Sequence, residues 1–444
     1  MVIKNDLTKG PLLSKMMTFA IPYLAACFLQ TFYGMADLFI TGQYYGAAPV
    51  TGVAIGSQVM HMVIVIIAGL TTGTTVCIAR AMGEKDDKGS YRLMGSSTLL
   101  FLPASFILTF ILIFSIPSIL TVLQTPLEAW EETTKYLYIC FAGIPFIIIY
   151  NVLSGILRGA GNTKAPMIFI AIAGLFNISL DYILIGHYHM AAAGAAWGTL
   201  ISEAVSVIFA LGYMYRNLMP LGLTLEDFKP LKSDIHDILS IGLPISCQDG
   251  LIQISFLAIT AIANGLGVEA AAAVGIVEKI ISFLFLVPSA MMATVSATAA
   301  QNAGARNHSR GRKALYYGIS ICIAFGIFCI ILVHYKAAEI MALFVPGEDN
   351  VVRMGDDYLQ SYVIDCAVAG VHFCFSGYFA AYRKAIFSFI HNVISIFAVR
   401  IPGTYLASVM FADPLWPMGM ATPAGSLLSV LICIFLYKKY IHER

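Results

Sequence analysis

Asp37, Asp181 and Glu203 stand inside long apolar stretches of the first half of the chain, where an ionised side chain is costly. Asn177 lies four residues before Asp181 and Thr199 four residues before Glu203, so each pair shares one face of a helix. Carboxylate, amide and hydroxyl oxygens are the hard ligands that a small cation prefers. Two carboxylates close together in a low dielectric need a proton or a cation between them. Asp37, Asn177, Asp181 and Thr199 are therefore candidates for a proton or sodium (Na+) site.

Other polar residues on apolar stretches are candidates for the wall of a cavity that holds substrate. These residues are Gln30, Tyr33, Asn151, Glu203 and, in the second half of the chain, Gln253. The alternative is that such groups only join helices by hydrogen bonds, as many polar residues in membranes do.

The rest of the chain is strongly apolar. Hydrophobic residues make up 59% of the 444 residues and charged residues 11%, against about 25% charged in an ordinary soluble domain. This composition excludes a soluble globular protein. Lys and Arg total 26, and Asp and Glu total 25. No basic surface for nucleic acid follows from this balance, so we expect no nucleic-acid partner.

Twelve apolar runs are long enough to cross a bilayer as helices. Their approximate bounds are 14–40, 50–72, 93–117, 135–157, 166–186, 191–215, 237–262, 271–298, 313–334, 355–381, 385–410 and 418–438. The sequence therefore predicts an all-α integral membrane protein with twelve transmembrane helices. With a rise of about 1.5 Å per residue, Asp37, Asp181 and Thr199 reach similar depths in the outer half of the membrane.

The basic residues favour one orientation in the membrane. A cytoplasmic N-terminus places most of the 26 Lys and Arg residues in cytoplasmic loops. The outer loops then hold essentially only Lys135, Lys336 and Arg353, each near several acids. The positive-inside rule thus predicts that both termini are cytoplasmic.

The chain also matches itself at an offset of 221 or 222 residues. Pro22 meets Pro244, and Tyr136 meets Tyr358. We therefore expect two pseudo-symmetric six-helix lobes. Their predicted bounds are 1–218 for the N-lobe and 237–444 for the C-lobe, with a cytoplasmic linker at 219–236. Many transporters consist of two such repeats with a site between them, although a purely structural duplication is the alternative.

The repeat offers a control for the candidate ion site. The positions that correspond to Asp37, Asn177, Asp181 and Thr199 are occupied by Ile259, Val399, Gly403 and Ala421. The ion-like set is thus confined to the first half, whereas a role in maintaining the fold would be expected in both halves.

The second half has its own charged residues in apolar runs: Asp249, Glu278, Lys279, Asp365 and Arg400. Glu278 and Lys279 are adjacent, so they point about 100° apart and each needs a partner on another helix. Asp249 and Asp365 are plausible partners for Lys279 and Arg400. We interpret this set as a structural network between helices, and a role in substrate binding stays open.

No catalytic pattern is present in the sequence. There is no Ser-His-Asp, His-Glu-x-x-His or Cys-x-x-Cys arrangement and no Walker motif to couple ATP. The glycine-containing stretch at 157–166 lacks the Gly-Lys-Ser/Thr ending of a phosphate loop. We therefore expect no enzyme and no cofactor other than a coupling ion.

Together these residues resemble the multidrug and toxic compound extrusion (MATE) family, in particular its DinF-like branch. The resemblance rests on the duplicated layout, on Pro22 followed by Tyr33 and Asp37, and on Asn177 and Asp181 with Thr199 beyond. It implies a prokaryotic plasma (inner) membrane protein that exports cationic amphipathic compounds in exchange for protons or sodium. It also implies a cation site at the four residues named above and a hinge at Pro22.

We therefore expect a secondary active antiporter that works by alternating access. Its expected partners are an organic cation as substrate and membrane lipid, and we expect a monomer. The alternative is a flippase for a lipid-linked saccharide with similar lobes. A flippase would need a more cationic cavity for pyrophosphate, whereas the membrane charges here lean acidic.

Overall fold

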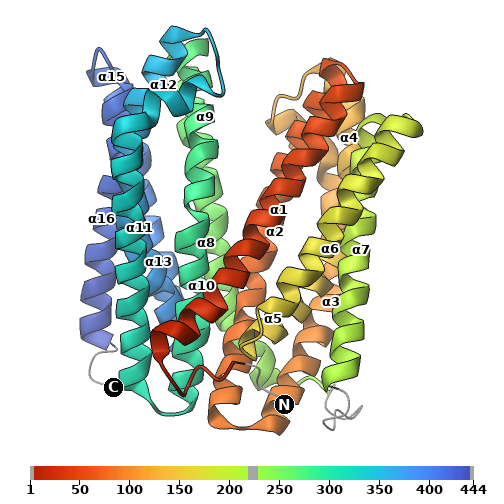
Figure 1. Ribbon diagram of the computed structural model, residues 1–444, viewed down its shortest axis with the longest axis vertical. Helices are drawn as coiled ribbons and strands as arrows, with labels where there is room; N and C mark the ends of the chain where they lie inside the picture. The colour runs from red at the N-terminus through yellow and green to blue at the C-terminus, as the bar shows by residue number, and fades with distance from the viewer. Residues whose placement is uncertain (1–4, 219–228, 441–444) are drawn as a thin grey trace. The chain divides into compact units, whose positions relative to one another are not determined.

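Long apolar segments form helices because every backbone N–H and C=O group is then satisfied within the segment. The computed structural model of the chain describes residues 5–218 and 229–440, and the regular elements in that part of the chain are all helices (Figure 1). The first half contains α1 (Leu12–Tyr44), α2 (Ala47–Glu84), α3 (Asp87–Val122), α4 (Leu127–Ala142), α5 (Ile144–Gly159), α6 (Lys164–Asp181), the π-helix η1 (Tyr182–His187) and α7 (Ala191–Leu218).

The second half repeats this layout with more interruptions. It contains α8 (Lys232–Asn264), α9 (Val268–Leu284), α10 (Leu286–Gly304), α11 (His308–Ala342), α12 (Asp349–Tyr362), α13 (Asp365–Ala381), α14 (Ile386–Ser395), the π-helix η4 (Ile396–Arg400), α15 (Ile401–Met410) and α16 (Leu415–Tyr440). In the described residues, 10 helical segments are long and apolar enough to cross a membrane, or up to 12 if each of two bent pairs is one span. The predicted all-α class with twelve spans is confirmed.

Two of the predicted spans are not single straight helices. The run at 135–157 consists of α4 and α5, which meet at a bend of 46°, and the run at 355–381 consists of α12 and α13, which meet at 41°. Pro145 lies in the first turn of α5. Proline has no N–H to donate to the preceding turn, which explains why α4 ends there. No proline marks the second break, and Asp365 begins α13.

Large apolar side chains on α3 face outward. Phe110 is 62% exposed and Phe114 is 80% exposed. Exposed apolar surface of this kind is unfavourable in water and is the normal lipid-facing surface of a membrane helix. These side chains therefore support the membrane assignment independently of hydropathy.

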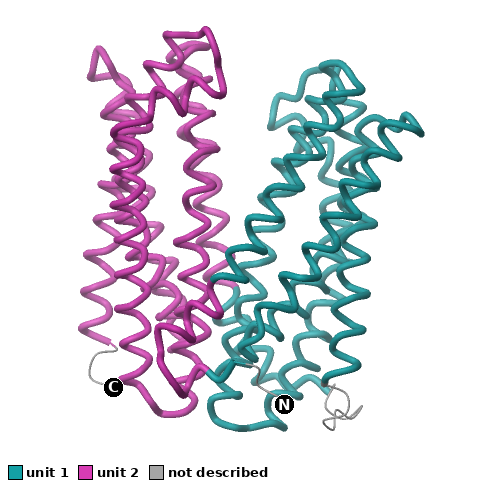
Figure 2. The backbone as a smooth tube through the Cα atoms, in the orientation of Figure 1, with its two compact units in different colours: residues 1–6, 21–242 teal, residues 7–20, 243–444 magenta. Residues whose placement is uncertain are grey.

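The described chain forms two compact units, coloured separately in Figure 2. Unit 1 holds residues 21–242 and unit 2 holds residues 7–20 and 243–444, with the N-terminal residues up to Asp6 assigned to unit 1. This division differs from the predicted lobe bounds at the starts of α1 and α8, and residues 219–228 of the predicted linker lie outside the described part of the chain. The start of α1 belongs to unit 2 and the rest of α1 to unit 1, whereas the start of α8 belongs to unit 1 and the rest of α8 to unit 2.

Close packing accounts for these assignments. In unit 2, Leu7 and Phe19 form a buried cluster with Ala297. In unit 1, a side chain on Gly242 would collide with the Leu70 backbone, so α8 approaches α2 as closely as glycine allows.

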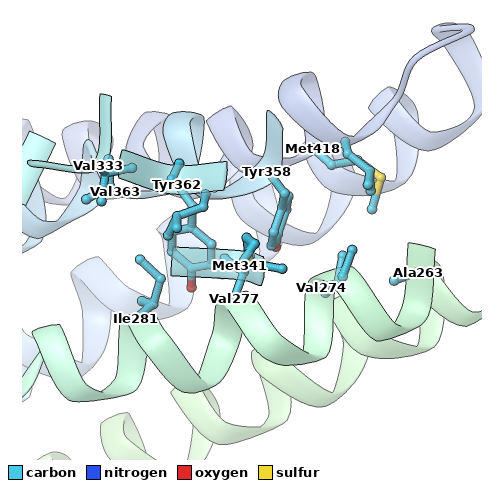
Figure 3. Close-up of a cluster of buried hydrophobic side chains, with 14 of the residues drawn as sticks. Ala263, Val274, Val277, Ile281, Val333, Met341, Tyr358, Tyr362, Val363 and Met418 are labelled. Atoms are coloured by element: carbon cyan, nitrogen blue, oxygen red, sulfur yellow. The ribbon is translucent and has the colours of Figure 1, made fainter. Parts of the chain in front are cut away.

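Each unit has its own apolar core. The core of unit 2 joins α8, α9, α11, α12 and α16, and its centre contains Val277, Tyr358 and Tyr362 (Figure 3). The core of unit 1 joins α1, α5, α6 and α7 around Tyr150 and Phe169. These cores fix the rotation of the helices that carry the polar residues described below.

Candidate ion-binding site

The four predicted ligands come from three helices of unit 1. Asp37 is on α1, Asn177 and Asp181 are on α6, and Thr199 is on α7. Asp37 is 3% exposed, and Asn177 and Asp181 are 0% exposed. The Thr199 Oγ1 hydroxyl donates a hydrogen bond of 3.0 Å to Asp37 Oδ2. Asp37 also interacts directly with the side chains of Asp181 and Asn177. The structure thus places the other three side chains beside the Asp37 carboxyl group.

Much of the hydrogen-bonding capacity of this cluster is unused. Among the described residues, no hydrogen bond of regular geometry is formed by Asp37 Oδ1, by either carboxyl oxygen of Asp181 or by the amide of Asn177, although these side chains lie beside one another. A buried carboxyl oxygen without a donor is costly, and two neighbouring carboxylates repel each other. A proton or a small cation between Asp37 and Asp181 removes both costs.

Gly198 was missed by the sequence reasoning. A Cβ atom at this position would collide with Asp181 Oδ1 and would stand 3.5 Å from Asn177 Nδ2. The glycine therefore leaves the space that the Asp181 carboxyl occupies beside Thr199. The available signal was a glycine inside a helix, which is unfavourable unless close approach requires it.

The local geometry of α6 changes at the site itself. Asp181 is the last residue of α6, and the π-helix η1 begins at Tyr182. Single π-turns inside helices are rare and are frequent at functional sites, because the wider turn shifts the following side chains. Periodicity does not reveal such a turn, so the sequence could not have predicted it.

The predicted cavity residues differ in what they touch. The Tyr33 hydroxyl donates to Glu203 Oε1 over 3.5 Å, and the Gln30 side chain also interacts with Tyr33. Asn151 Nδ2 instead donates to the Ile147 carbonyl of its own helix at 2.9 Å, so its described hydrogen bond does not join it to the ion site.

Two predicted residues lie away from this cluster. Pro22 is buried within α1, two residues past the point where the helix passes from unit 2 to unit 1. Gln253 is partly buried on α8 in unit 2. The candidate ion site belongs to unit 1, whereas Gln253 belongs to unit 2.

The repeat-related place in unit 2 is apolar. A Cβ on Gly403 would stand 3.2 Å from the Ala421 Cβ, so two helices meet there through small residues. These are the positions that correspond to Asp181 and Thr199. Unit 2 thus replaces the carboxyl and hydroxyl groups by a direct helix contact, and the ion-like cluster is confined to unit 1.

Arg400 forms the centre of the polar network in unit 2. It donates through Nη2 to the Tyr362 hydroxyl at 2.8 Å, and its Cζ lies 4.8 Å from the centre of the Phe256 ring. It also interacts electrostatically with Asp365 and Glu278. Neither Tyr362 nor Phe256 was among the predicted residues.

The predicted pairing in this network is only partly correct. Arg400 does interact with Asp365, as expected. Glu278 accepts a hydrogen bond of 3.0 Å from Thr260 Oγ1 rather than from a basic residue. Lys279 is exposed, and none of the ion pairs in the described residues joins it to Asp249. Lys279 points about 100° away from Glu278 on α9, which leaves it outside the network.

The ligand types limit which ions unit 1 could hold. Within the described residues, no group of three or more His, Cys, Asp or Glu side chains is placed to hold a metal ion. The candidate site has two carboxyl groups together with a neutral amide and a neutral hydroxyl. This donor set fits a proton or a monovalent cation better than a zinc-like ion.

Comparisons with known proteins agree with this architecture. The chain is 26% identical over 436 residues to the probable multidrug resistance protein YpnP of Bacillus subtilis (strain 168), which covers 98% of this chain and 96% of that protein. It is 24% identical over 436 residues to the multidrug export protein MepA of Staphylococcus aureus (strain MSSA476), which covers 96% of this chain and 95% of that protein.

A solved structure has the same fold. A MOP superfamily transporter from Pyrococcus furiosus superposes with a TM-score of 0.91 at 22% identity, over 98% of this chain and 97% of that one. The reverse polarity of that protein's binding pocket suggests a different function for it. The family model described as MatE matches residues 22–183 and again residues 244–406, which confirms the internal repeat and the resemblance. The chain is a member of the MatE family.

Proposed function

We propose that this membrane transporter is a secondary antiporter that exports cationic amphipathic compounds in exchange for a proton or a sodium ion. The observation that carries the proposal is the Asp37 and Asp181 pair, buried together without a donor between the two carboxyl groups. The names of the two bacterial relatives, which refer to multidrug resistance and multidrug export, support the choice of cargo.

In the proposed cycle the coupling ion comes from outside and neutralises the Asp37 and Asp181 pair. The neutral pair no longer attracts a cationic compound, so the compound leaves toward the outside. Return of the ion to the cytoplasm restores the charge. One pH unit supplies about 1.4 kcal/mol per proton. Exchange of one ion for one monovalent cation moves no net charge across the membrane, so each tenfold ion gradient sustains a concentration ratio of about ten.

The breadth of cargo follows from composition. The chain has 19 Met, 28 Phe and 22 Tyr residues. Flexible thioethers and aromatic faces accept organic cations of different shapes. We propose that the protein acts as a monomer in a prokaryotic plasma membrane with both termini in the cytoplasm. In unit 2, the start of α1 and the end of α16 lie at the same end (Figure 1), which is compatible with this orientation.

The test is transport of a fluorescent organic cation in proteoliposomes that contain the purified protein. An imposed pH or sodium gradient is expected to drive the dye against its own gradient. Transport of a lipid-linked saccharide with no response to either gradient would instead identify a flippase. No ion-driven movement of any organic cation would refute the antiporter proposal.

A further inference from the structure

A line of polar side chains continues along α1 from the ion site toward the start of the helix. Asp37, Tyr33, Gln30, Cys27 and Tyr23 are spaced by three or four residues and so share one helix face. Gln30 interacts with Tyr33, and Cys27 interacts with Tyr23. All five residues lie in the part of α1 that belongs to unit 1.

Glu203 on α7 contacts this line of side chains at Tyr33, which lies one helical turn closer to the start of α1 than Asp37 does. Thr199 and Glu203 on α7 face Asp37 and Tyr33 on α1, so the two helices are joined by two successive contacts. The first is the Thr199 to Asp37 hydrogen bond of 3.0 Å, and the second is the Tyr33 to Glu203 hydrogen bond of 3.5 Å. Four residues of helix separate the two contacts by about 6 Å.

Within the described part of the chain, the contacts of Glu203 do not include a basic partner that would explain a buried carboxyl group as part of the packing between helices. Glu203 is 9% exposed, and no Lys or Arg forms an ion pair with it in the described residues. The titratable groups that face it from the neighbouring helices are Tyr33 on α1 and Tyr150 on α5. The Tyr150 hydroxyl donates to the Pro166 carbonyl at 3.1 Å, whereas the Tyr33 hydroxyl donates to the Glu203 carboxyl group, which also interacts with the Ser206 side chain.

The oxygen atoms at this second contact are too few for a metal cation. A sodium ion would need several oxygen ligands, whereas the described contact offers one phenol oxygen, one carboxyl group and the Ser206 hydroxyl, which already donates to the Glu203 backbone carbonyl at 2.7 Å. A hydrogen-bonded phenol and carboxylate can instead pass a proton between them. Tyr33 lies one helical turn from Asp37 on the same face of α1, and its hydroxyl donates to Glu203 on α7.

We propose that Glu203 is a second proton station, which receives the coupling proton from the Asp37 and Asp181 pair through the Tyr33 hydroxyl. The proposal rests on the antiport function proposed above. In the transfer, the O–H bond of protonated Asp37 breaks, the Tyr33 oxygen accepts that proton and its own proton passes to the Glu203 carboxylate. The products are an ionised Asp37, a neutral Tyr33 and a protonated Glu203, so charge and protons balance.

The far end of the line carries a fixed positive charge. The Arg158 guanidinium carbon lies 5.3 Å from the centre of the Tyr23 ring, and Arg158 interacts electrostatically with Cys27 and Tyr150. A positive charge here repels a free cation that moves along the line. It does not prevent a proton from binding to Glu203.

The experiment compares three variants in the full-length protein reconstituted into liposomes. Glu203→Gln removes the proton acceptor and keeps the side-chain shape, Tyr33→Phe removes only the hydroxyl, and Glu203→Asp keeps a carboxyl group. Each is assayed for efflux of a fluorescent cation driven by a pH gradient, for efflux rate against pH, and for equilibrium binding of the same dye.

We expect Glu203→Gln and Tyr33→Phe each to slow proton-driven efflux by about tenfold or more, with dye binding unchanged and the dependence of the rate on pH flattened. Because both residues act in one transfer, the double variant is expected to be no slower than either single variant. Glu203→Asp is expected to restore part of the rate. Glu131→Gln is the matched control, because its side chain is 80% exposed and pairs only with Lys135.

Three results would overturn the proposal. If Glu203→Gln keeps the efflux rate and the pH profile of the unchanged protein, Glu203 does not bind the coupling proton during transport. A loss of dye binding in parallel with rate would make Glu203 a cargo ligand, and a double variant slower by the product of the single effects would make the two residues independent. If the antiport function itself is wrong, the unchanged protein also fails to couple dye efflux to the pH gradient, so the two failures are distinguishable.

Discussion

Among single residues, Gly198 shapes the candidate ion site although it carries no functional group. The Asp181 carboxyl occupies the space that any side chain on Gly198 would fill. The Asn177 amide lies at the edge of the same space, and Thr199 follows directly in the chain. The position of Asp181 relative to Asp37 therefore depends on the absence of a methyl group on α7.

Gly198→Ala is predicted to lower ion-driven efflux by about tenfold or more, since displacement of a functional group by about 1 Å often costs that much. The thermal unfolding temperature in detergent is expected to change little, because the methyl group meets the end of a short side chain rather than backbone. Efflux assays in proteoliposomes and thermal unfolding check the two expectations.

The control is a second glycine on the same helix. A Cβ on Gly212 would meet nothing within 4 Å. Gly212→Ala is therefore expected to keep the efflux rate and to leave stability equal or slightly higher, since alanine favours a helix over glycine by about 1 kcal/mol. Equal efflux in both alanine variants would contradict the role of Gly198.

At the scale of elements, the first helix of each repeat begins in the opposite unit. The start of α1 is held in unit 2 through the backbone of Leu7. Its N–H donates to Gln301 Oε1 at 3.1 Å, and its carbonyl accepts from Asn302 Nδ2 at 3.2 Å and from Arg310 Nε at 3.1 Å. Three side chains thus form hydrogen bonds with the backbone of Leu7, and none of these bonds depends on the Leu7 side chain.

The start of α8 is held in unit 1 by an ion pair. Arg92 Nε on α3 lies 2.8 Å from Asp234 Oδ2, and Ser96 Oγ donates to the same carboxyl oxygen at 3.3 Å. Asp234 is only 5% exposed. Its position in the first turn of α8 also places its negative charge at the positive end of the helix dipole.

Arg92→Ala is predicted to destabilise unit 1 by about 1–3 kcal/mol, because it leaves a buried carboxylate with one weak donor. Arg80→Ala is the comparison, since the Arg80 and Glu84 pair is formed within one exposed helix turn and such pairs contribute at most about 1 kcal/mol. Thermal unfolding in detergent measures both variants. Equal unfolding temperatures for the two would show that the Asp234 contact does not anchor α8.

At the scale of the whole chain, two copies of one six-helix unit have diverged in chemistry. Unit 1 holds the two carboxyl groups of the ion site, whereas unit 2 holds Arg400 with Asp365 and Glu278 around it. The repeat-related helices of unit 2 meet through Gly403 and Ala421 instead. We infer that coupling is the task of the first repeat and that Arg400 keeps the acids of the second repeat paired.

Much of this arrangement could be predicted from the sequence. Hydropathy and the offset repeat predicted the twelve spans and the duplication, and the rise per residue predicted that Asp37, Asp181 and Thr199 would lie at similar depths. Contacts between helices that are far apart in the sequence were harder to predict, because periodicity indicates which residues share a helix face but not which helix packs against that face. Gly198, Tyr362 and the π-turn after Asp181 therefore appeared only in the structure, and the pairing assumed for Lys279 was wrong.

The measurement that tests the central claim most directly is ion-driven efflux by Asp37→Asn in proteoliposomes. The amide keeps the shape of the side chain and its contact with Thr199, but it cannot carry the exchangeable charge. The account predicts that efflux no longer responds to an imposed pH or sodium gradient and that the fluorescent cation binds more weakly than to the unchanged protein. Asp413→Asn, an exposed position in unit 2, serves as the matched control and should transport normally. Full gradient-driven efflux by Asp37→Asn would contradict the account.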